Sequence, residues 1–189
     1  MQKSDTLENV SILTAQDQVK FFEWSCDSEL ILAGLPSRNR VQVFSLKDPK
    51  WSCTVDSGVL GLEWATFSPD GRHIIASSEF NINFTIFSMI DKSVKTIEWP
   101  KPPKDNLKFT LNGKLAIIGE RKKFQDSISI IRLADWTLDS HFETETQDFK
   151  SIQLNSLGAV IALNDPLPKP QIVVYSITGK KLAAIPNGL

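Results

Sequence analysis

The sequence has few cysteines, no excess of charge of one sign and no long apolar run. Only Cys26 and Cys53 occur in 189 residues, so ligands for a zinc cage are lacking, and two reduced, buried thiols are favoured over one disulfide. Lys and Arg number 21 against 22 Asp and Glu, which argues against a nucleic-acid partner. No run approaches the roughly 18 apolar residues that a membrane span needs. We therefore expect neither a nucleic-acid partner nor a membrane segment.

Residues for catalysis or metal binding are equally scarce. The only histidines, His73 and His141, have no second His or Cys at a metal-ligand spacing. Ser68, Asp70 and His73 lie within six residues, on a turn and the strand after it, and no serine elbow is present. A glycine-rich phosphate loop is also missing. The sequence predicts no catalytic residue, no metal and no cofactor, and hence not an enzyme.

Apolar residues make up 41% of the chain, enough for a folded core, and they recur in a repeat. Each copy has an apolar anchor, a short polar turn and a second apolar run, as in Phe67 followed by Ser68-Pro69-Asp70-Gly71 and His73-Ile74-Ile75-Ala76. The anchors are 43, 42 and 45 residues apart. They are Trp24, Phe67, Phe109 and Leu154.

A second phrase recurs about 20 residues after each anchor, with the same period. Val41-Gln42-Val43-Phe44-Ser45 is its first copy. Its anchors are 43, 44 and 44 residues apart, and two registers with one period make coincidence an unsatisfactory explanation. These second anchors are Phe44, Phe87, Ile131 and Tyr175.

Each repeat therefore predicts four strands. Asp-Gly and Asn-Gly suit two-residue hairpins, the runs beside them are rich in Ile, Val and Phe, and no stretch has a sustained helical period. A four-stranded unit of about 40–45 residues is the blade of a WD40-type β-propeller. We predict an all-β fold of about four antiparallel blades, at residues 18–56, 59–98, 105–142 and 149–186.

The repeat is degenerate, because the Trp-Asp pair that names such repeats is replaced in every copy, for example by Phe44-Ser45. With two histidines the chain cannot form an Asp-His-Ser-Trp hydrogen-bond network in every blade. Apolar stacking between blades therefore has to supply most of the stability. We expect the anchors Trp24, Phe67 and Phe109 to be largely buried. The structural blade anchors as a whole are Trp24, Phe67, Phe109, Phe44, Phe87 and Tyr175.

Four blades are too few to close a ring of about seven, so residues 1–189 are expected to form one partial, open propeller domain. Residues 6–13 are predicted to be the outer strand of an incomplete preceding blade. An open array exposes an apolar blade face at each end, and the isolated chain is expected to self-associate through these faces.

The loops from second to third strands are expected to share one face with the blade connections. That face combines both signs of charge, which suits protein partners better than a nucleic-acid track. For any single residue, simple solvation is favoured; reversing Arg121, Lys122 and Lys123 together is expected to weaken partner binding and leave the fold intact. The candidate partner-binding residues are Arg38, Arg40, Arg121, Lys122, Lys123, Glu143, Glu145 and Asp148.

Three segments carry a more specific resemblance. They are 23–28 (Glu-Trp-Ser-Cys-Asp-Ser), 68–74 (Ser-Pro-Asp-Gly-Arg-His-Ile) and the stretch from Asp135-Trp136-Thr137-Leu138 to Thr146-Gln147-Asp148. With them the chain resembles the WD-repeat protein eight family, from about Thr6 to Leu182, and looks like an internal portion of it. The family's propeller has more blades than four, and the fourth copy here has Leu154 in place of an aromatic anchor.

The resemblance implies a non-enzymatic scaffold in the cytoplasm and cytoskeleton, at centrosomes and spindle poles. It implies a coiled-coil partner, microtubule minus-end anchoring, spindle organisation and a role in cilium assembly. One alternative is a ribosome-associated propeller of the translation-initiation type. Another is the gating propeller of a serine peptidase, which is disfavoured because no catalytic domain follows Leu189.

Overall fold

The structure, a computed structural model, describes residues 12–56, 58–98, 100–101 and 104–186. These residues form four antiparallel sheets of four strands each, and we name the sheets blades 1 to 4 in chain order. Within every blade each strand pairs with the next strand in the chain. The predicted all-β class with four four-stranded blades is confirmed.

The strands are short, between three and eight residues. Blade 1 contains β1 (Phe21–Trp24), β2 (Leu30–Leu35), β3 (Arg40–Ser45) and β4 (Ser52–Val55). Blade 2 contains β5 (Ala65–Phe67), β6 (His73–Ser78), β7 (Asn83–Ser88) and β8 (Val94–Glu98). Blade 3 contains β9 (Leu107–Phe109), β10 (Leu115–Lys122), β11 (Gln125–Arg132) and β12 (Thr137–Glu143). Blade 4 contains β13 (Ser151–Leu154), β14 (Val160–Asp165), β15 (Gln171–Ser176) and β16 (Lys181–Pro186).

Two 3-10 turns, η1 (Pro36–Arg38) and η2 (Lys104–Asn106), complete the elements of the described residues. The first turn of every blade is closed by a short polar side chain that accepts a backbone N–H on the following strand. In blades 1 to 3 the acceptors are the hydroxyls of Ser25, Ser68 and Thr110, at 2.9 to 3.0 Å. These side-chain bonds satisfy backbone N–H groups that a longer strand would pair with its neighbour, so the turn between the first two strands is tight.

At the end of the third strand, where WD40 repeats have the Asp of the Trp-Asp pair, blades 1 and 4 have a serine that bonds the following turn. The Ser45 hydroxyl accepts the Asp48 N–H at 3.1 Å, and the Ser176 hydroxyl accepts the Lys180 N–H at 3.0 Å. The replacement thus closes the turn to the fourth strand locally.

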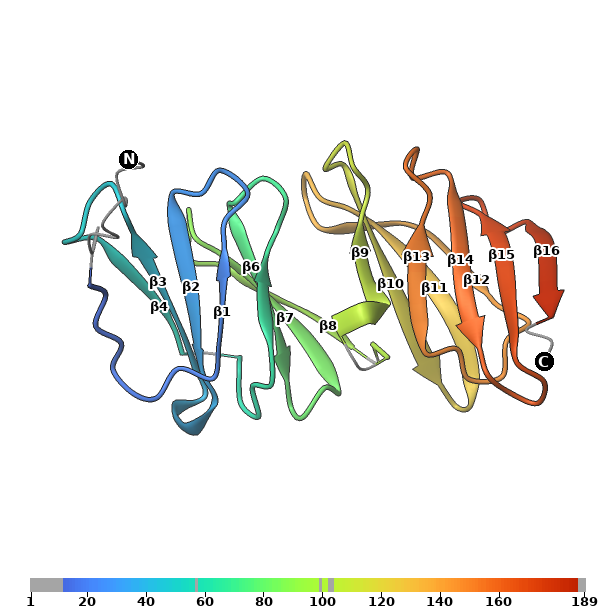
Figure 1. The fold of residues 1–189 in the computed structure, drawn as a ribbon, viewed down its shortest axis with the longest axis horizontal. Coiled ribbons are helices and arrows are strands. Elements are labelled where there is room, and N and C mark those ends of the chain that lie inside the picture. The colour runs from blue at the N-terminus through green and yellow to red at the C-terminus, as the bar shows by residue number, and fades with distance from the viewer. Residues whose placement is uncertain (1–11, 57, 99, 102–103, 187–189) are drawn as a thin grey trace, which may run out of the picture.

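The four blades follow one another along the long axis of the molecule, so that blade 1 and blade 4 lie at its opposite ends (Figure 1). Blade 1 and blade 4 are therefore not neighbours, and the predicted open, partial propeller is confirmed. The outer strand predicted at 6–13 lies mainly outside the described residues. Ile12 and Leu13, which are described, are not part of a strand.

The core of the described residues consists of hydrophobic clusters that each span two successive blades. Leu32 and Val43 of blade 1 pack with Phe67 and Phe87 of blade 2. The next cluster joins blades 2 and 3, with Phe109 at its margin, and the third joins blades 3 and 4 around Tyr175. Burial between blades, rather than within one blade, therefore stabilises the fold.

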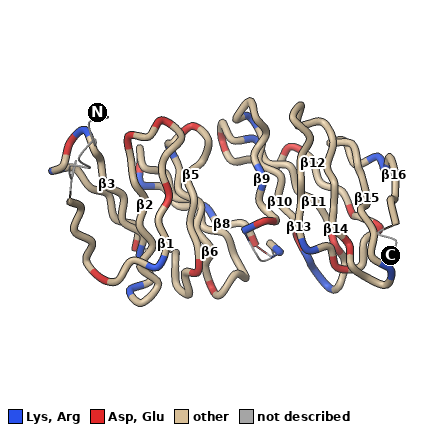
Figure 2. Tube along the Cα trace, viewed as in Figure 1, with Lys and Arg blue, Asp and Glu red and all other residues tan. Residues whose placement is uncertain are grey.

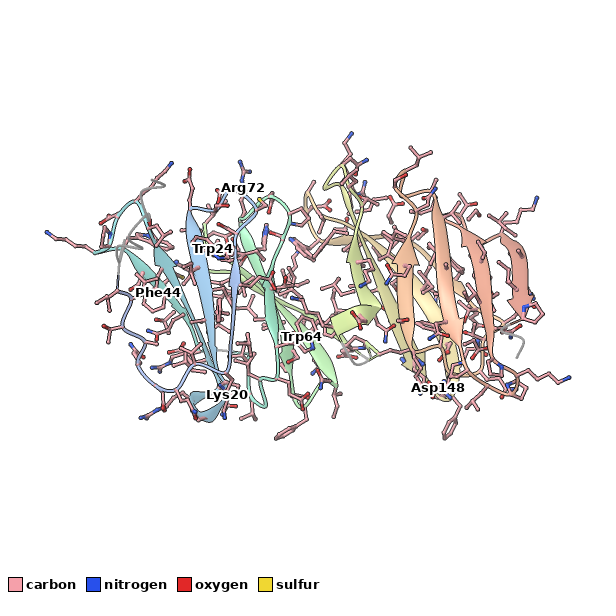
Figure 3. The ribbon with its side chains drawn as sticks, viewed as in Figure 1. Lys20, Trp24, Phe44, Trp64, Arg72 and Asp148 are labelled. Atoms are coloured by element: carbon pink, nitrogen blue, oxygen red, sulfur yellow. The ribbon has the colours of Figure 1, made fainter. Side chains whose placement is uncertain are left out.

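The expectation that Trp24 is buried is wrong, since 49% of its surface is exposed. Trp24 pairs with Ile31, which pairs with Phe44, and these residues alternate with Leu32, which faces blade 2. Because side chains alternate between the faces of a strand, Trp24 and Phe44 lie on the face directed away from blade 2 (Figure 3). No described blade precedes blade 1, so Trp24 stays half-exposed and Phe44 is only half-buried.

Phe67 and Trp24 occupy corresponding positions and therefore make a matched pair for testing the packing. Replacing Phe67, only 5% exposed, by Ala should lower the free energy of unfolding by about 3–5 kcal/mol. Trp24→Ala should lower it by less than half as much, because the exposed ring loses little burial. Urea unfolding followed by circular dichroism measures both, and equal losses would contradict the placement of these faces.

Candidate functional site

Two kinds of segment meet at one edge of the array, which we call the loop edge. It lies at the bottom of Figure 1. In Figure 3 the side chains of Lys20 and Asp148 lie at this edge and Arg72 lies at the opposite one. The turns from second to third strands are 36–39, 79–82, 123–124 and 166–170, and the blade connections include 58–64, 100–101, 104–106 and 144–150.

A buried carboxylate, Asp126, organises the loop edge between blades 3 and 4. Asp126 has no exposed surface and lies opposite Arg121 in the β10–β11 pair. Its Oδ1 atom accepts hydrogen bonds from Lys101 Nζ at 2.9 Å and Arg121 Nη1 at 2.7 Å, and its Oδ2 atom accepts the Phe149 N–H at 2.9 Å. One carboxylate thus ties blade 3 to the connections that precede and follow it.

Lys101 is also buried, with 4% of its surface exposed. Its Nζ atom donates a second hydrogen bond, to Asp148 at 2.6 Å, and lies 4.6 Å from the centre of the Phe149 ring. Burial raises the pKa of the Asp148 carboxyl, but hydrogen bonds from Lys101 and Lys150 and their positive charges outweigh burial and lower this pKa to about 2. Asp148 is therefore ionised at neutral pH and, with Asp126, compensates the buried ammonium group.

A second buried carboxylate, Asp165, holds the same connection from blade 4. It accepts the backbone N–H groups of Gln147 and Asp148, each at 3.3 Å. Neither Asp165 nor Asp126 is among the residues predicted from the sequence, although each is an acidic residue at the loop-edge end of a strand rich in Ile, Val or Leu. That signal, a charge at a strand position that should be buried, was available in the sequence.

The structure brings only part of the predicted partner-binding set together. Arg121 and Asp148 lie 3.2 Å apart in the network around Asp126. Arg38 and Arg40 lie on blade 1, at the far end of the array (Figure 1), where each forms its own ion pair. Because Arg121 bonds a buried carboxylate, the expectation that its reversal leaves the fold intact no longer holds.

The other predicted residues lie around blade 3. Lys122 ends β10, and the exposed Lys123 lies in the turn after it, where Figure 2 shows basic residues at the lower edge. Glu143 is exposed at the end of β12. Glu145 pairs with Lys181 on β16, which makes it part of the outer rim of blades 3 and 4.

A cavity of about 460 Å³ opens at the loop edge beside this network. One wall is the β6–β7 turn of blade 2, with Phe80 and Ile82, and the other is formed by the connections on either side of blade 3. Large apolar side chains are exposed at the turn tips nearby, among them Phe80 and Phe124. The loop edge therefore combines apolar tips, a cavity and compensated charges, which are features of protein-binding surfaces.

The described residues contain no group of three or more His, Cys, Asp or Glu that would hold a metal ion. In the region of Ser68, Asp70 and His73, the serine hydroxyl donates to Asp70 at 2.5 Å and accepts the His73 backbone N–H at 3.0 Å, which closes the β5–β6 turn. No helix among the described residues is long and apolar enough to cross a membrane.

Solved structures share this fold at low sequence identity. The Myceliophteria thermophila Cps50 (Swd1) β-propeller domain matches 87% of the chain and 55% of its own, with a TM-score of 0.58 and 14% identity. Kuenenia stuttgartiensis hydrazine synthase matches 93% of the chain and 52% of its own, with a TM-score of 0.65 and 14% identity. No protein-family model matches the sequence. At this identity the structural matches establish the fold alone.

By its repeat, its open array of blades and these matches, the chain has the fold of a WD40-type β-propeller. More particularly, it is similar to the mouse (Mus musculus) WD repeat-containing protein WRAP73, with 39% identity over 179 residues. The match covers 95% of the chain and 39% of the mouse protein. The expected resemblance to a WD-repeat protein is thereby confirmed.

Removing the Asp126 carboxylate tests the buried network. Asp126→Ala should lower the free energy of unfolding by about 3–5 kcal/mol, because it leaves Lys101 buried with one carboxylate fewer. Glu145→Ala, which breaks only a rim pair, should cost no more than about 1 kcal/mol. Chemical denaturation measures the free energy of unfolding of both variants. An Asp126→Ala variant as stable as the unmutated chain would show that the network does not support the fold.

Proposed function

We propose that this chain forms part of a cytoplasmic, cytoskeletal scaffold at centrosomes and spindle poles. In this proposal it binds a coiled-coil partner and supports microtubule minus-end anchoring, spindle organisation and cilium assembly. The WD-repeat relative supports the general role, a protein-interaction scaffold. The observation that carries the proposal is a 39% identity spread over 95% of the chain, which includes the discriminating segment from Asp135 to Asp148.

The chemistry of the loop edge supports a helical partner. Parallel and antiparallel coiled coils present rows of Glu and Lys beside their apolar seam. The loop edge offers exposed cations, such as Lys123 and Lys150, next to exposed apolar tips, such as Phe80 and Phe124. Such an edge can pair with the charged flanks of a helix and contact its apolar residues at the same time.

A ribosome-associated role is the second candidate, and it predicts RNA-dependent sedimentation. The formal net charge of −1 and the compensation of Lys101 and Arg121 by carboxylates favour the protein scaffold. Nuclease treatment separates the two roles, because capture of a protein partner survives it.

Proximity labelling of the tagged chain in dividing cells, with nuclease controls, tests the scaffold role. Labelled proteins should be enriched in coiled-coil centrosomal components. Lys122→Glu with Lys123→Glu should reduce this labelling about fivefold, the effect of losing roughly 1 kcal/mol of rim electrostatics.

The matched control for this experiment is Arg72→Glu with Lys114→Glu, two exposed positions at the opposite edge, which should leave labelling unchanged. Labelling that is dominated by ribosomal proteins, or lost on nuclease treatment, would reject the scaffold in favour of the second candidate. Equal effects of both double variants would reject the loop edge as the binding surface.

The outer faces of the array are a further surface, through which we propose that the isolated chain self-associates. On blade 1 the outward face carries Phe22 and Trp24, both exposed. On blade 4 the face opposite Tyr175 carries Ile172 and the exposed Ile185, which pair with one another. Apolar patches of about several hundred Å² on a protein surface mark association sites.

Light scattering coupled to size exclusion tests this association. A solution of the 189-residue chain should show a mass of at least twice 21.2 kDa, and Phe22→Asp with Trp24→Asp should return it toward the monomer. A monodisperse monomer of the unmutated chain that does not bind an apolar dye would contradict the open faces as association sites.

A further inference from the structure

The loop-edge cavity has two chemically different walls. With a volume of about 460 Å³ it falls in the range of sites that enclose a small ligand or a few side chains. Phe80, Ile82 and Pro100 form its apolar side. The charged lining residues are Lys101, Arg121, Lys150 and Asp148, three cations and one carboxylate.

The β6–β7 turn presents Phe80 to solvent in a strained conformation. Glu79, Phe80 and Asn81 have φ values of 49°, 56° and 69°, and left-handed backbone costs a residue with a side chain of the order of 1–3 kcal/mol. Yet 73% of Phe80 is exposed, so the phenyl ring gains little from burial within this chain. Strain that holds an exposed aromatic ring beside a cavity indicates a binding role.

Side chains of the connection before blade 2, Glu63 and Trp64, hold this turn in place. Trp64 donates its Nε1–H to Asn81 Oδ1 at 3.1 Å, and the Asn81 amide donates to Glu63 at 2.5 Å. The Trp64 ring packs edge-on against Phe84, with 4.9 Å between ring centres (Figure 3 labels Trp64). The apolar wall is therefore pre-organised before any partner arrives, which lowers the entropy cost of binding.

The cations of the opposite wall differ in what they can still bind. Lys101 is buried and bonded to Asp126 and Asp148, so its charge is compensated. Lys150 pairs with Asp148, and Arg121 pairs with Asp126 and Asp148, but 57% and 30% of their side chains are exposed. Both can therefore bind a further carboxylate at the cavity mouth. Their charge attracts an acidic segment and repels a basic one.

We propose that this cavity binds an acidic peptide segment of a protein partner, which inserts one bulky apolar side chain against Phe80 and Ile82 and pairs its carboxylates with Lys150 and Arg121. This inference rests on the proposed scaffold function, since it states the chemistry of a partner for the same edge. The partner segment contacts two elements that are far apart in sequence, the β6–β7 turn and the connection 144–150.

Panning a phage library of random dodecapeptides against the immobilised 189-residue chain tests the chemistry without a known partner. Enriched peptides should carry several Asp or Glu residues around one Phe, Leu, Ile, Met or Trp. Their affinity, measured by fluorescence anisotropy with labelled synthetic copies, should fall as salt concentration rises. Failure to enrich peptides, or enrichment of basic ones, would overturn the proposal.

Matched variants then locate the site. Phe80→Asn removes the ring while keeping a residue type that tolerates left-handed backbone, and it should weaken the enriched peptides about tenfold, as the loss of one buried aromatic contact does. Phe124→Asn makes the same change at the corresponding turn of blade 3, outside the cavity lining, and should have no effect. There φ is 66° and 89% of the residue is exposed.

Charge reversal has a matched pair as well. Lys150→Glu should weaken binding, whereas Lys169→Glu, at an exposed position outside the cavity lining, should not. Equal effects within either pair would overturn the assignment to this cavity. If peptide binding behaves as stated but centrosomal labelling is absent, the scaffold proposal fails and the cavity stands; the reverse result rejects the cavity alone.

Discussion

The face-to-face packing of each blade on the next is the interaction on which the rest of this structure depends. Blades 2 and 3 have a neighbour on both sides, and their third strands, β7 and β11, are buried on both faces apart from their ends. The third strand of blade 4, β15, alternates instead, with Val173 and Tyr175 buried and their neighbours half-exposed. One sequence pattern thus gives two burial patterns, because burial is decided by whether another blade is present.

The same packing places the polar chemistry. Apolar faces fill the space between blades, so charged side chains are pushed to the edges, and the few that enter the interior need partners. Asp126, with Lys101, Arg121 and the Phe149 N–H around it, meets this requirement by binding the blade connections. Gly119 contributes as well, because a side chain there would collide with the Phe149 ring at 2.8 Å. These contacts fix the loop edge beside blade 3, and the cavity opens next to this fixed part.

Local features were predictable because they depend on neighbours in the chain. The period of about 43 residues locates the blades, and the Asp-Gly and Asn-Gly turns locate the hairpins around Gly71 and Gly113, whose φ values are positive. The buried network was missed because Lys101, Asp126 and Asp148 are 22 to 47 residues apart, and nothing in the sequence shows that they meet. The strained turn at Phe80 was missed for a different reason, since of Glu79, Phe80 and Asn81 only the asparagine is a residue type that favours left-handed backbone.

By itself the sequence determined the strand pattern, the four-stranded unit and the dominance of apolar stacking, since these follow from the period of apolar residues and from turn chemistry. Only the tertiary structure decided which anchors are covered. Phe67 and Trp24 hold corresponding positions, and one is buried and the other exposed because blade 1 precedes Phe67 and no described blade precedes Trp24. It also decided which charges are structural and which can bind a partner, because this depends on distances between segments that come together only when the blades stack.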